Sequence, residues 1–310
     1  MEDQLQKFMF SAAPVRGEIV SLRNTWQEVL ARRQYPAPVR DVLGEMMAAC
    51  ALLSANLKFD GTLIMQIFGD GPVKMLVVQC NSDLTMRATA KFAGETGDAI
   101  RDGAAFVEML NANGNGRCVI TLDPRDKQPG QQPYQGIVGL EGDSIAEALE
   151  TYMRQSEQLD SRLWLAADAH CCAGVLLQKL PGDGGRAVLA TADTDAWERT
   201  TALAATITPE ELLRHAADTI TRRLFWQERL DHYRPLEPRF ECRCSRGRIG
   251  RMLLSLGQDE VDSIITELGS VEVTCDFCNA RQAFDAIDVA QLFRTGSVNP
   301  AGDIPAAAPH

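Results

Sequence analysis

The sequence lacks a long apolar run, an excess of positive charge and a nucleotide-binding loop. Its longest strongly apolar stretch without charge, Met46–Leu57, has twelve residues, which is too short to cross a bilayer as a helix. Lys and Arg number 31 against 42 Asp and Glu, a net charge of −11, whereas nucleic-acid binding needs clustered positive charge. No Gly-Lys-Ser/Thr loop is present. We therefore expect no membrane, nucleic acid or nucleotide among the partners.

A secretion signal is also missing, because residues 1–18 carry acidic side chains and only a short apolar run. We therefore expect a cytoplasmic protein. The nine cysteines are an odd number in a long chain, which argues against a disulfide framework. Four of them form two close pairs near the C-terminus. The other five are scattered and receive no role: Cys50, Cys80, Cys118, Cys171 and Cys172.

The spacing of apolar residues predicts an α+β fold for residues 1–182. Strands joined by short turns favour a mostly antiparallel sheet with helices packed against it. Two methionines in the first helix, Met46 and Met47, are expected in the core. Helices are predicted at Pro38–Leu57 and Ser144–Arg154, and strands at Thr62–Phe68, Val73–Cys80, Leu84–Phe92, Cys118–Leu122, Gln135–Leu140, Leu163–Ala167 and Gly174–Leu180.

A helical linker is predicted for residues 183–238, after the glycine-rich loop Pro181–Gly185. A short helix is expected at Asp195–Ala205. A second helix is predicted for Pro209–Leu230, because Thr208 and Glu211 form a capping-box pattern around a proline at the first helical position.

The second linker helix ends in three consecutive apolar residues, Leu224, Phe225 and Trp226. Such a trio is too broad for one narrow stripe on a helix. We therefore expect this helix to pack on the N-terminal sheet and to bury all three side chains.

Residues 239–295 contain Cys242-Arg-Cys244, thirty intervening residues and then Cys275-Asp-Phe-Cys278. Two close pairs of thiolates suit one tetrahedral Zn²⁺ per chain, with no position left for a catalytic water. Closing the loop costs about 3 kcal/mol, whereas structural zinc contributes roughly 10–16 kcal/mol. Residues 296–310 are expected to be a disordered tail.

Local signals between and after the cysteine pairs predict two short helices and a hairpin. Ser245 is expected to cap the first helix, and Gly257 to end it, with Asp259–Leu268 as the second helix. The strands Val271–Thr274 and Gln282–Phe284 are expected to flank the second pair. The four arginines near the first pair could offset the negative charge of a four-thiolate site: Arg243, Arg246, Arg248 and Arg251.

Other functions stay open at this point. The arginines would suit a zinc-ribbon nucleic-acid binder, although the net charge of −11 argues against it. Cys275-Asp-Phe-Cys278 would suit a dithiol oxidoreductase, although such a motif normally opens a helix after a strand. His170-Cys171-Cys172 pairs a base with a thiol, but we interpret it as small buried residues that enter a strand.

The cysteine pattern, followed by Ala283-Phe284-Asp285-Ala286, resembles the zinc domain of the heat shock protein 33 family, the redox-regulated 33 kDa chaperonins of bacteria. The resemblance covers almost the whole chain and is weakest over Asp183–Thr208. Further matching segments are Val15–Glu18, Leu57–Gly61, Gly69–Pro72, Tyr134–Gly136, Gly139–Asp143, Ser156–Leu159, Leu176–Gln178 and Glu260–Ile264.

This resemblance implies a chaperone rather than an enzyme: an ATP-independent holdase that is inactive when reduced and zinc-bound. Oxidation with unfolding stress would activate it to bind unfolding client proteins, often as a homodimer. Leu224–Trp226 becomes a weak candidate for a client-binding surface. The resemblance also implies four zinc ligands, Cys242, Cys244, Cys275 and Cys278, which would form the disulfides Cys242–Cys244 and Cys275–Cys278 on oxidation.

Overall fold

The computed structural model describes residues 2–57, 60–94, 100–127, 132–181 and 195–296, and it divides into two compact units. The first unit comprises Met1–Leu30 and Gln34–Glu241, and the second comprises Ala31–Arg33 and Cys242–His310. The predicted domain boundary near residue 183 lies outside the described residues, as does the predicted tail, residues 296–310, except for Gly296. Among the described helices, none has the length and apolar character needed to span a membrane.

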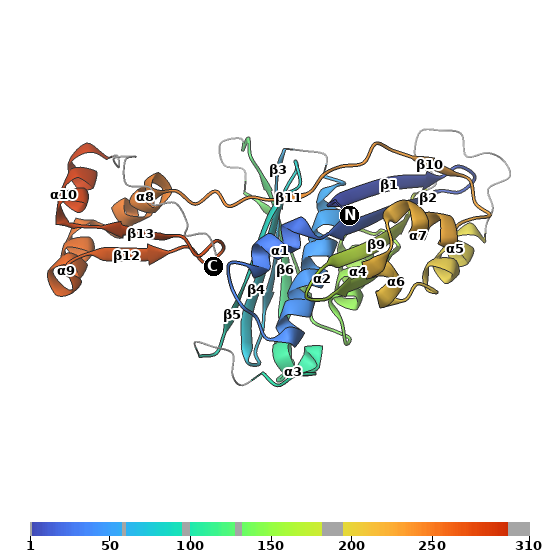
Figure 1. Cartoon of the computed structure of the whole chain (residues 1–310), viewed down its shortest axis with the longest axis horizontal. Helices are drawn as coiled ribbons and strands as arrows, with labels where there is room; N and C mark the ends of the chain where they lie inside the picture. The colour runs from blue at the N-terminus through green and yellow to red at the C-terminus, as the bar shows by residue number, and fades with distance from the viewer. Residues whose placement is uncertain (1, 58–59, 95–99, 128–131, 182–194, 297–310) are drawn as a thin grey trace. The chain divides into compact units, whose positions relative to one another are not determined.

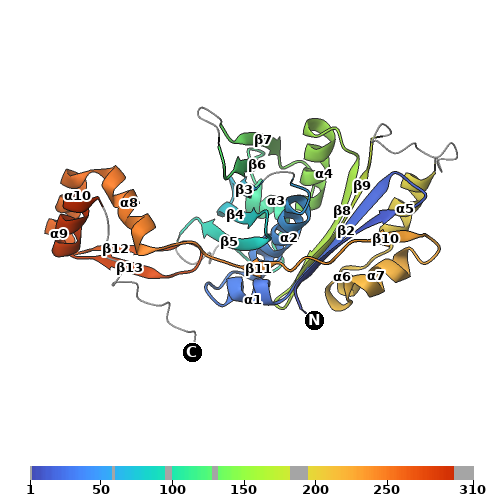
Figure 2. The same ribbon diagram turned by 90° about the horizontal axis from the view of Figure 1, so that it is seen from above.

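Two sheets form the first unit, where the sequence predicted one (Figures 1 and 2). The five-stranded sheet has the order β10-β1-β2-β9-β8, with bounds β10 (Leu230–His232), β1 (Gln4–Phe10), β2 (Val15–Leu22), β9 (Cys172–Lys179) and β8 (Ser161–Ala167). The six-stranded sheet has the order β11-β5-β4-β3-β6-β7, with bounds β11 (Arg239–Phe240), β5 (Thr85–Phe92), β4 (Val73–Asn81), β3 (Gly61–Phe68), β6 (Arg117–Pro124) and β7 (Tyr134–Gly139).

Antiparallel pairing dominates both sheets, as predicted. The one parallel pair among the described strands joins β11 to β5. Every strand that the sequence predicted is present. The strands β1 and β2 were missed because Gln6 and Glu18 are buried polar residues that interrupt the apolar alternation.

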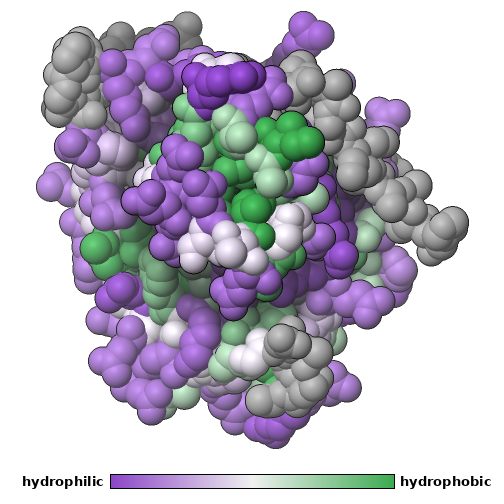
Figure 3. Space-filling model, turned by 90° about the vertical axis from the view of Figure 1, so that its left-hand side faces the viewer, coloured by the Kyte–Doolittle hydropathy of each residue, from purple (hydrophilic) through white to green (hydrophobic). Residues whose placement is uncertain are grey.

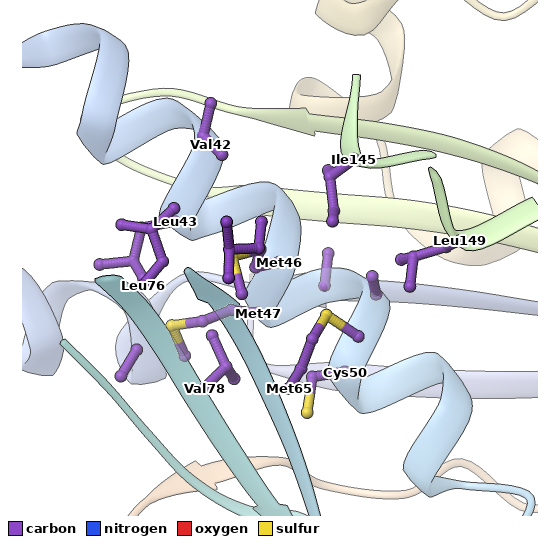
Figure 4. Packing of buried hydrophobic residues seen from close by; sticks show 14 of the residues in the cluster. Val42, Leu43, Met46, Met47, Cys50, Met65, Leu76, Val78, Ile145 and Leu149 are labelled. Carbon is purple, nitrogen blue, oxygen red and sulfur yellow. The ribbon is translucent and has the colours of Figure 1, made fainter. Parts of the chain in front are cut away.

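The helix α2 (Ala37–Ser54) contacts strands of both sheets and forms the centre of the main core (Figure 4). Its side chains Met46, Met47 and Cys50 are fully buried, so the expected core role of the methionines is confirmed. Gly44 lets the helix approach a strand closely, because a Cβ there would lie 2.5 Å from the Cβ of Ala167. The shorter helices α1 (Asn24–Leu30), α3 (Phe106–Leu110) and α4 (Ile145–Ser156) complete this unit's core region.

The predicted helix Pro209–Leu230 is wrong as a single element. The structure has α5 (Ala196–Ala204) followed by two short helices, α6 (Pro209–Arg214) and α7 (Ala217–Leu224). His215 and Ala216 separate the two with extended backbone, at ψ 150° and 152°. The break lets α6 contact β8 and β9 while α7 contacts β1 and β2, so both helices bury their apolar side chains on the same sheet.

The apolar trio at the end of α7 is only partly buried. Leu224 and Phe225 are 9% and 2% exposed, and Phe225 packs against Phe8 and Phe10 at ring-centroid distances of 5.8 and 5.0 Å. Trp226 is 72% exposed, contrary to expectation. The helix ends at Leu224, so the next residues turn away and Trp226 leaves the buried face.

The second unit contains the predicted helices and hairpin plus one unpredicted helix. Its elements are α8 (Arg246–Leu256), α9 (Gln258–Leu268), β12 (Val271–Thr274), β13 (Arg281–Phe284) and α10 (Ala286–Thr295). Ser245 caps α8 and Gly257 ends it, as predicted. The small core has seven buried residues: Ile249, Leu253, Val261, Val271, Phe284, Val289 and Leu292.

Apolar side chains also reach the surface of this unit. Figure 3, viewed from the side on which α8, α9 and α10 are drawn, shows hydrophobic patches among hydrophilic residues. The exposed large apolar residues of the unit are Met252, Leu256, Leu268 and Ile287.

Candidate metal centre

The four paired cysteines converge in the second unit, with all four Sγ atoms within 4.8 Å of one another. The Sγ–Sγ distance is 3.7 Å for Cys242 and Cys275 and 3.1 Å for Cys244 and Cys278. A tetrahedral zinc ion with Zn–S bonds of about 2.3 Å places its sulfurs about 3.8 Å apart. The donor set and its spacing therefore fit a four-coordinate metal ion.

Two short backbone motifs position these sulfurs. Cys242 and Cys244 lie in the irregular segment before α8, whose first turn is fixed by the Ser245 hydroxyl accepting from the Arg248 N–H. Cys275 and Cys278 occupy the turn between β12 and β13. In that turn the Asn279 N–H donates to the Cys275 carbonyl at 2.9 Å, and Asn279 has a left-handed φ of 59°.

The crowded sulfurs perturb one another electrostatically. Burial, followed by contact with the Cys278 thiol, raises the pKa of Cys244 to about 12. Donation toward Cys242 raises the pKa of Cys275 to about 12, and the same hydrogen bond lowers the pKa of Cys242. Four thiolates at this spacing need a cation, and metal binding must release protons from the cluster.

One arginine of the cluster near the first cysteine pair, Arg246, has a structural role within the second unit. Arg246 is buried, with its guanidinium carbon 4.2 Å from the centroid of the Phe284 ring. It forms a 2.6 Å ion pair with Asp288 and donates to the Ala283 carbonyl at 2.6 Å. Arg246 therefore links the segment after the first cysteine pair to β13 and α10, which follow the second pair.

Sequence reasoning missed this link, although a signal was present. The Asp285 carboxylate caps α10 by accepting hydrogen bonds from the Ile287 and Asp288 N–H groups. In turn, the Asp285 N–H donates to the Asp288 carboxylate. This capping box predicts the helix, but the partner of Asp288 lies forty-two positions away in the chain.

The five remaining cysteines are buried, each 1% exposed or less. Burial raises the pKa of Cys80 and Cys118 to about 12 and raises those of the other three. Cys172 begins β9, and the Cys171 thiol lies 3.6 Å from the Ser21 hydroxyl. The interpretation of His170-Cys171-Cys172 as buried residues that enter a strand is confirmed for Cys171 and Cys172 and is wrong for His170, which is exposed. A buried neutral thiol is a poor nucleophile.

A protein-family model described as Hsp33 protein matches residues 3–285. The chain belongs to the Hsp33 family. Among Hsp33 relatives, the 33 kDa chaperonin of Methylobacillus flagellatus is 47% identical over 305 residues, which is 98% of this chain and 99% of the relative. The 33 kDa chaperonin of Chromobacterium violaceum is 48% identical over 292 residues, 94% of each chain.

A solved Hsp33 structure has the same fold. The crystal structure of the 33 kDa chaperonin of Thermotoga maritima, described as a heat shock protein 33 homologue, matches with a TM-score of 0.75 at 22% identity, covering 94% of this chain and 98% of the other. The α+β architecture predicted from the sequence is confirmed, and the names of the relatives support a chaperone function.

Proposed function

We propose that this Hsp33-family chain is a redox-regulated, ATP-independent holdase of the reducing cytoplasm. It binds unfolding proteins and prevents their aggregation under oxidative stress. The observation that carries the proposal is the cluster of four Sγ atoms within 4.8 Å of one another, which brings together two cysteine pairs separated by thirty residues.

The resident metal is Zn²⁺, one per chain. A set of four sulfur ligands favours a borderline or soft ion over a hard one. When bound, zinc ties the segment before α8 to the turn after β12. The unit's small apolar core has seven buried residues, so the metal contributes much of its folding free energy.

Oxidation removes this tie. Each pair of thiols loses two electrons and two protons to one peroxide molecule, which is reduced to two waters while an S–S bond forms. The proposed bonds are Cys242–Cys244 and Cys275–Cys278. Loops this short restrain the unfolded chain little, so zinc leaves and no long-range cross-link replaces it.

The reduced geometry makes this pairing worth testing. The Sγ–Sγ distances of Cys242–Cys275 and Cys244–Cys278 are short, at 3.7 and 3.1 Å. Disulfides between these residues would cross-link the two ends of the unit and keep it compact. Peptide mapping of peroxide-treated protein under non-reducing conditions separates the two patterns. Mainly long-range disulfides would refute the switch.

Unfolding of the second unit then loosens the linker helices α6 and α7. Their departure would uncover Leu224 and Phe225 and the apolar face of the five-stranded sheet that they cover. Trp226 is exposed already and is available to a client at any time. We propose that the active form binds clients as a homodimer, which sedimentation of the oxidised protein tests.

The decisive experiment measures zinc and chaperone activity on the same samples. Reduced protein should contain one zinc per chain and should not delay aggregation of a heat-unfolded model client. Peroxide at elevated temperature should release the zinc and suppress aggregation without ATP. Suppression that is equal before and after oxidation, or reduced protein without zinc, would overturn the proposal.

A further inference from the structure

One segment of the first unit pairs with β1 through its backbone. This strap, Arg229–Glu241, contains β10 and β11 and follows the outer edge of β1 before reaching β5 (Figures 1 and 2). Along β1, Leu5 and Leu236 exchange two N–H to carbonyl bonds of 2.8 and 2.9 Å. The Tyr233 N–H donates to the Lys7 carbonyl at 3.0 Å, and the Ser11 N–H donates to the Arg229 carbonyl at 2.9 Å.

Side chains attach the strap mainly at its two ends, where Leu230 packs against the cluster around Phe225, Pro238 is buried and Arg239 forms a 3.0 Å ion pair with Asp83. The middle of the strap pairs with β1 through its backbone. Every side chain from Asp231 to Glu237 is exposed, including Tyr233 at 52% and Leu236 at 39%. Backbone pairing of this kind supplies affinity without regard to the sequence of the added strand. Any extended polypeptide could therefore form the backbone hydrogen bonds that the strap forms with β1.

The opposite edge of the same sheet is closed differently. On β8 the Leu163 N–H donates to the carboxylate of Glu150 at 2.8 Å, so a side chain of the folded core blocks strand addition. On β1 the edge is covered by the strap, whose backbone occupies the positions that an added strand would take. Its last residue, Glu241, directly precedes Cys242, so the strap is joined in sequence to the first metal ligand.

We propose that the β1 edge is a client-docking site, where an extended segment of an unfolding protein adds as a strand in place of the strap. This inference rests on the proposed holdase function and names the form of polypeptide that it captures. Unfolding proteins expose free backbone N–H and carbonyl groups, which folded proteins have paired. An edge that reads backbone groups therefore selects unfolding chains.

Apolar contacts would strengthen such a strand. Phe8 and Phe10 point to the same face of β1, with ring centroids 5.9 Å apart, and Phe225 of the linker covers both. When the linker helices leave with the strap, these two rings become available beside the edge. Alternate side chains of the client strand lie on that face.

The direct test uses fluorescent peptides with the strap sequence, Arg229–Glu241, and anisotropy with oxidised and reduced protein. The unmodified peptide should bind oxidised protein and not reduced protein, whose own strap holds the edge. N-methylation at Tyr233 and Leu236 removes two of the donors to β1 and should weaken binding at least about tenfold.

The matched control peptide carries N-methyl groups at Leu230 and His232. These residues oppose Phe10 and Phe8 at positions that alternate with the hydrogen-bonded ones, so their amides point away from β1. This peptide should bind like the unmodified one. Equal binding by both methylated peptides would mean docking through side chains and would overturn the proposal.

Variants of the full chain test the strap itself. Tyr233→Pro removes the amide that donates to Lys7 and should let reduced protein bind the peptide. Arg234→Pro, one residue further on, removes an amide on the solvent side of the edge, a position that tolerates proline. Reduced Arg234→Pro should bind no more of the strap peptide than the reduced unmodified protein does. No difference between the two variants would contradict the strap's role.

Amide exchange on oxidised protein locates the client. The Leu5 and Ser11 amides should exchange faster after oxidation and become protected again when an unfolded client is added. Protection on β7 instead, or protection of Leu5 and Ser11 by self-association without client, would overturn the assignment.

If oxidised protein suppresses aggregation but the methylation pattern has no effect, this inference alone fails. If it suppresses nothing, the proposed function fails first.

Discussion

Replacing Arg246 by alanine should strongly destabilise the second unit. The side chain is 7% exposed and combines the Asp288 ion pair, the Ala283 hydrogen bond and the Phe284 ring contact. Removing one partner of a buried ion pair costs about 3–5 kcal/mol. Asp288 is 29% exposed and regains some hydration, so we expect the low end, about 3 kcal/mol.

This loss should appear as weaker metal retention, because zinc binding and folding of the unit are coupled. A change of about 3 kcal/mol corresponds to roughly a hundredfold shift in an equilibrium constant. Titration with a chromophoric chelator should therefore extract zinc from Arg246→Ala at roughly a hundredfold lower chelator activity. Arg246→Lys keeps the positive charge but loses the planar guanidinium group, so its zinc retention should lie between that of Arg246→Ala and that of the unmodified protein.

The control is Arg251→Ala, an exposed arginine on the same helix, which should keep zinc like the unmodified protein. Asp288→Ala combined with Arg246→Ala should cost less than the sum of the two single changes, because the two groups interact directly. Equal zinc retention in Arg246→Ala and Arg251→Ala, or strict additivity in the cycle, would refute the reasoning.

Three further predictions concern the metal, the linker and pH. Cys242→Ser should leave three thiolates and lose most zinc at a chelator concentration that the unmodified protein withstands, as measured by elemental analysis. Phe225→Asp places a charge in the aromatic cluster and should raise the activity of reduced protein in an aggregation assay, whereas Trp226→Asp, at an exposed position, should not; equal effects would contradict linker docking. Burial raises the pKa of Glu18 from 4.5 to about 7. The protonated carboxyl therefore contributes to the stability of the first unit, and this contribution is fully present below pH 4.5. It amounts to about 3 kcal/mol at most and is lost as the pH rises through 7. Denaturant titrations between pH 5 and 8 should show that Glu18→Gln flattens this dependence, and the exposed Glu28→Gln should leave it unchanged.

Local chemistry made the metal centre and many elements predictable from sequence. The cysteine pairs have a spacing typical of metal ligands. Ser245 and Thr208 indicate helix starts because their side chains accept hydrogen bonds within the first helical turn. Strands such as β3 follow strict alternation because one face is buried and the other is not. These signals extend over a few residues, so they need no knowledge of the rest of the fold.

Long-range pairing decided what the sequence did not reveal. Gln6 and Glu18 obscure β1 and β2, and the break at His215 exists only because two helices must fit one sheet. The strap was not predicted because its backbone pairs with β1 while its side chains from Asp231 to Glu237 remain exposed, so this stretch has no alternating apolar pattern. Partners such as Asp288 for Arg246 lie far apart in the chain, and only the folded arrangement brings them into contact. The sequence by itself determined the set of four cysteines that could hold a metal ion and the elements whose stabilising contacts are local. The tertiary structure decided the contacts that close over long loops, because their free energy depends on where distant segments meet.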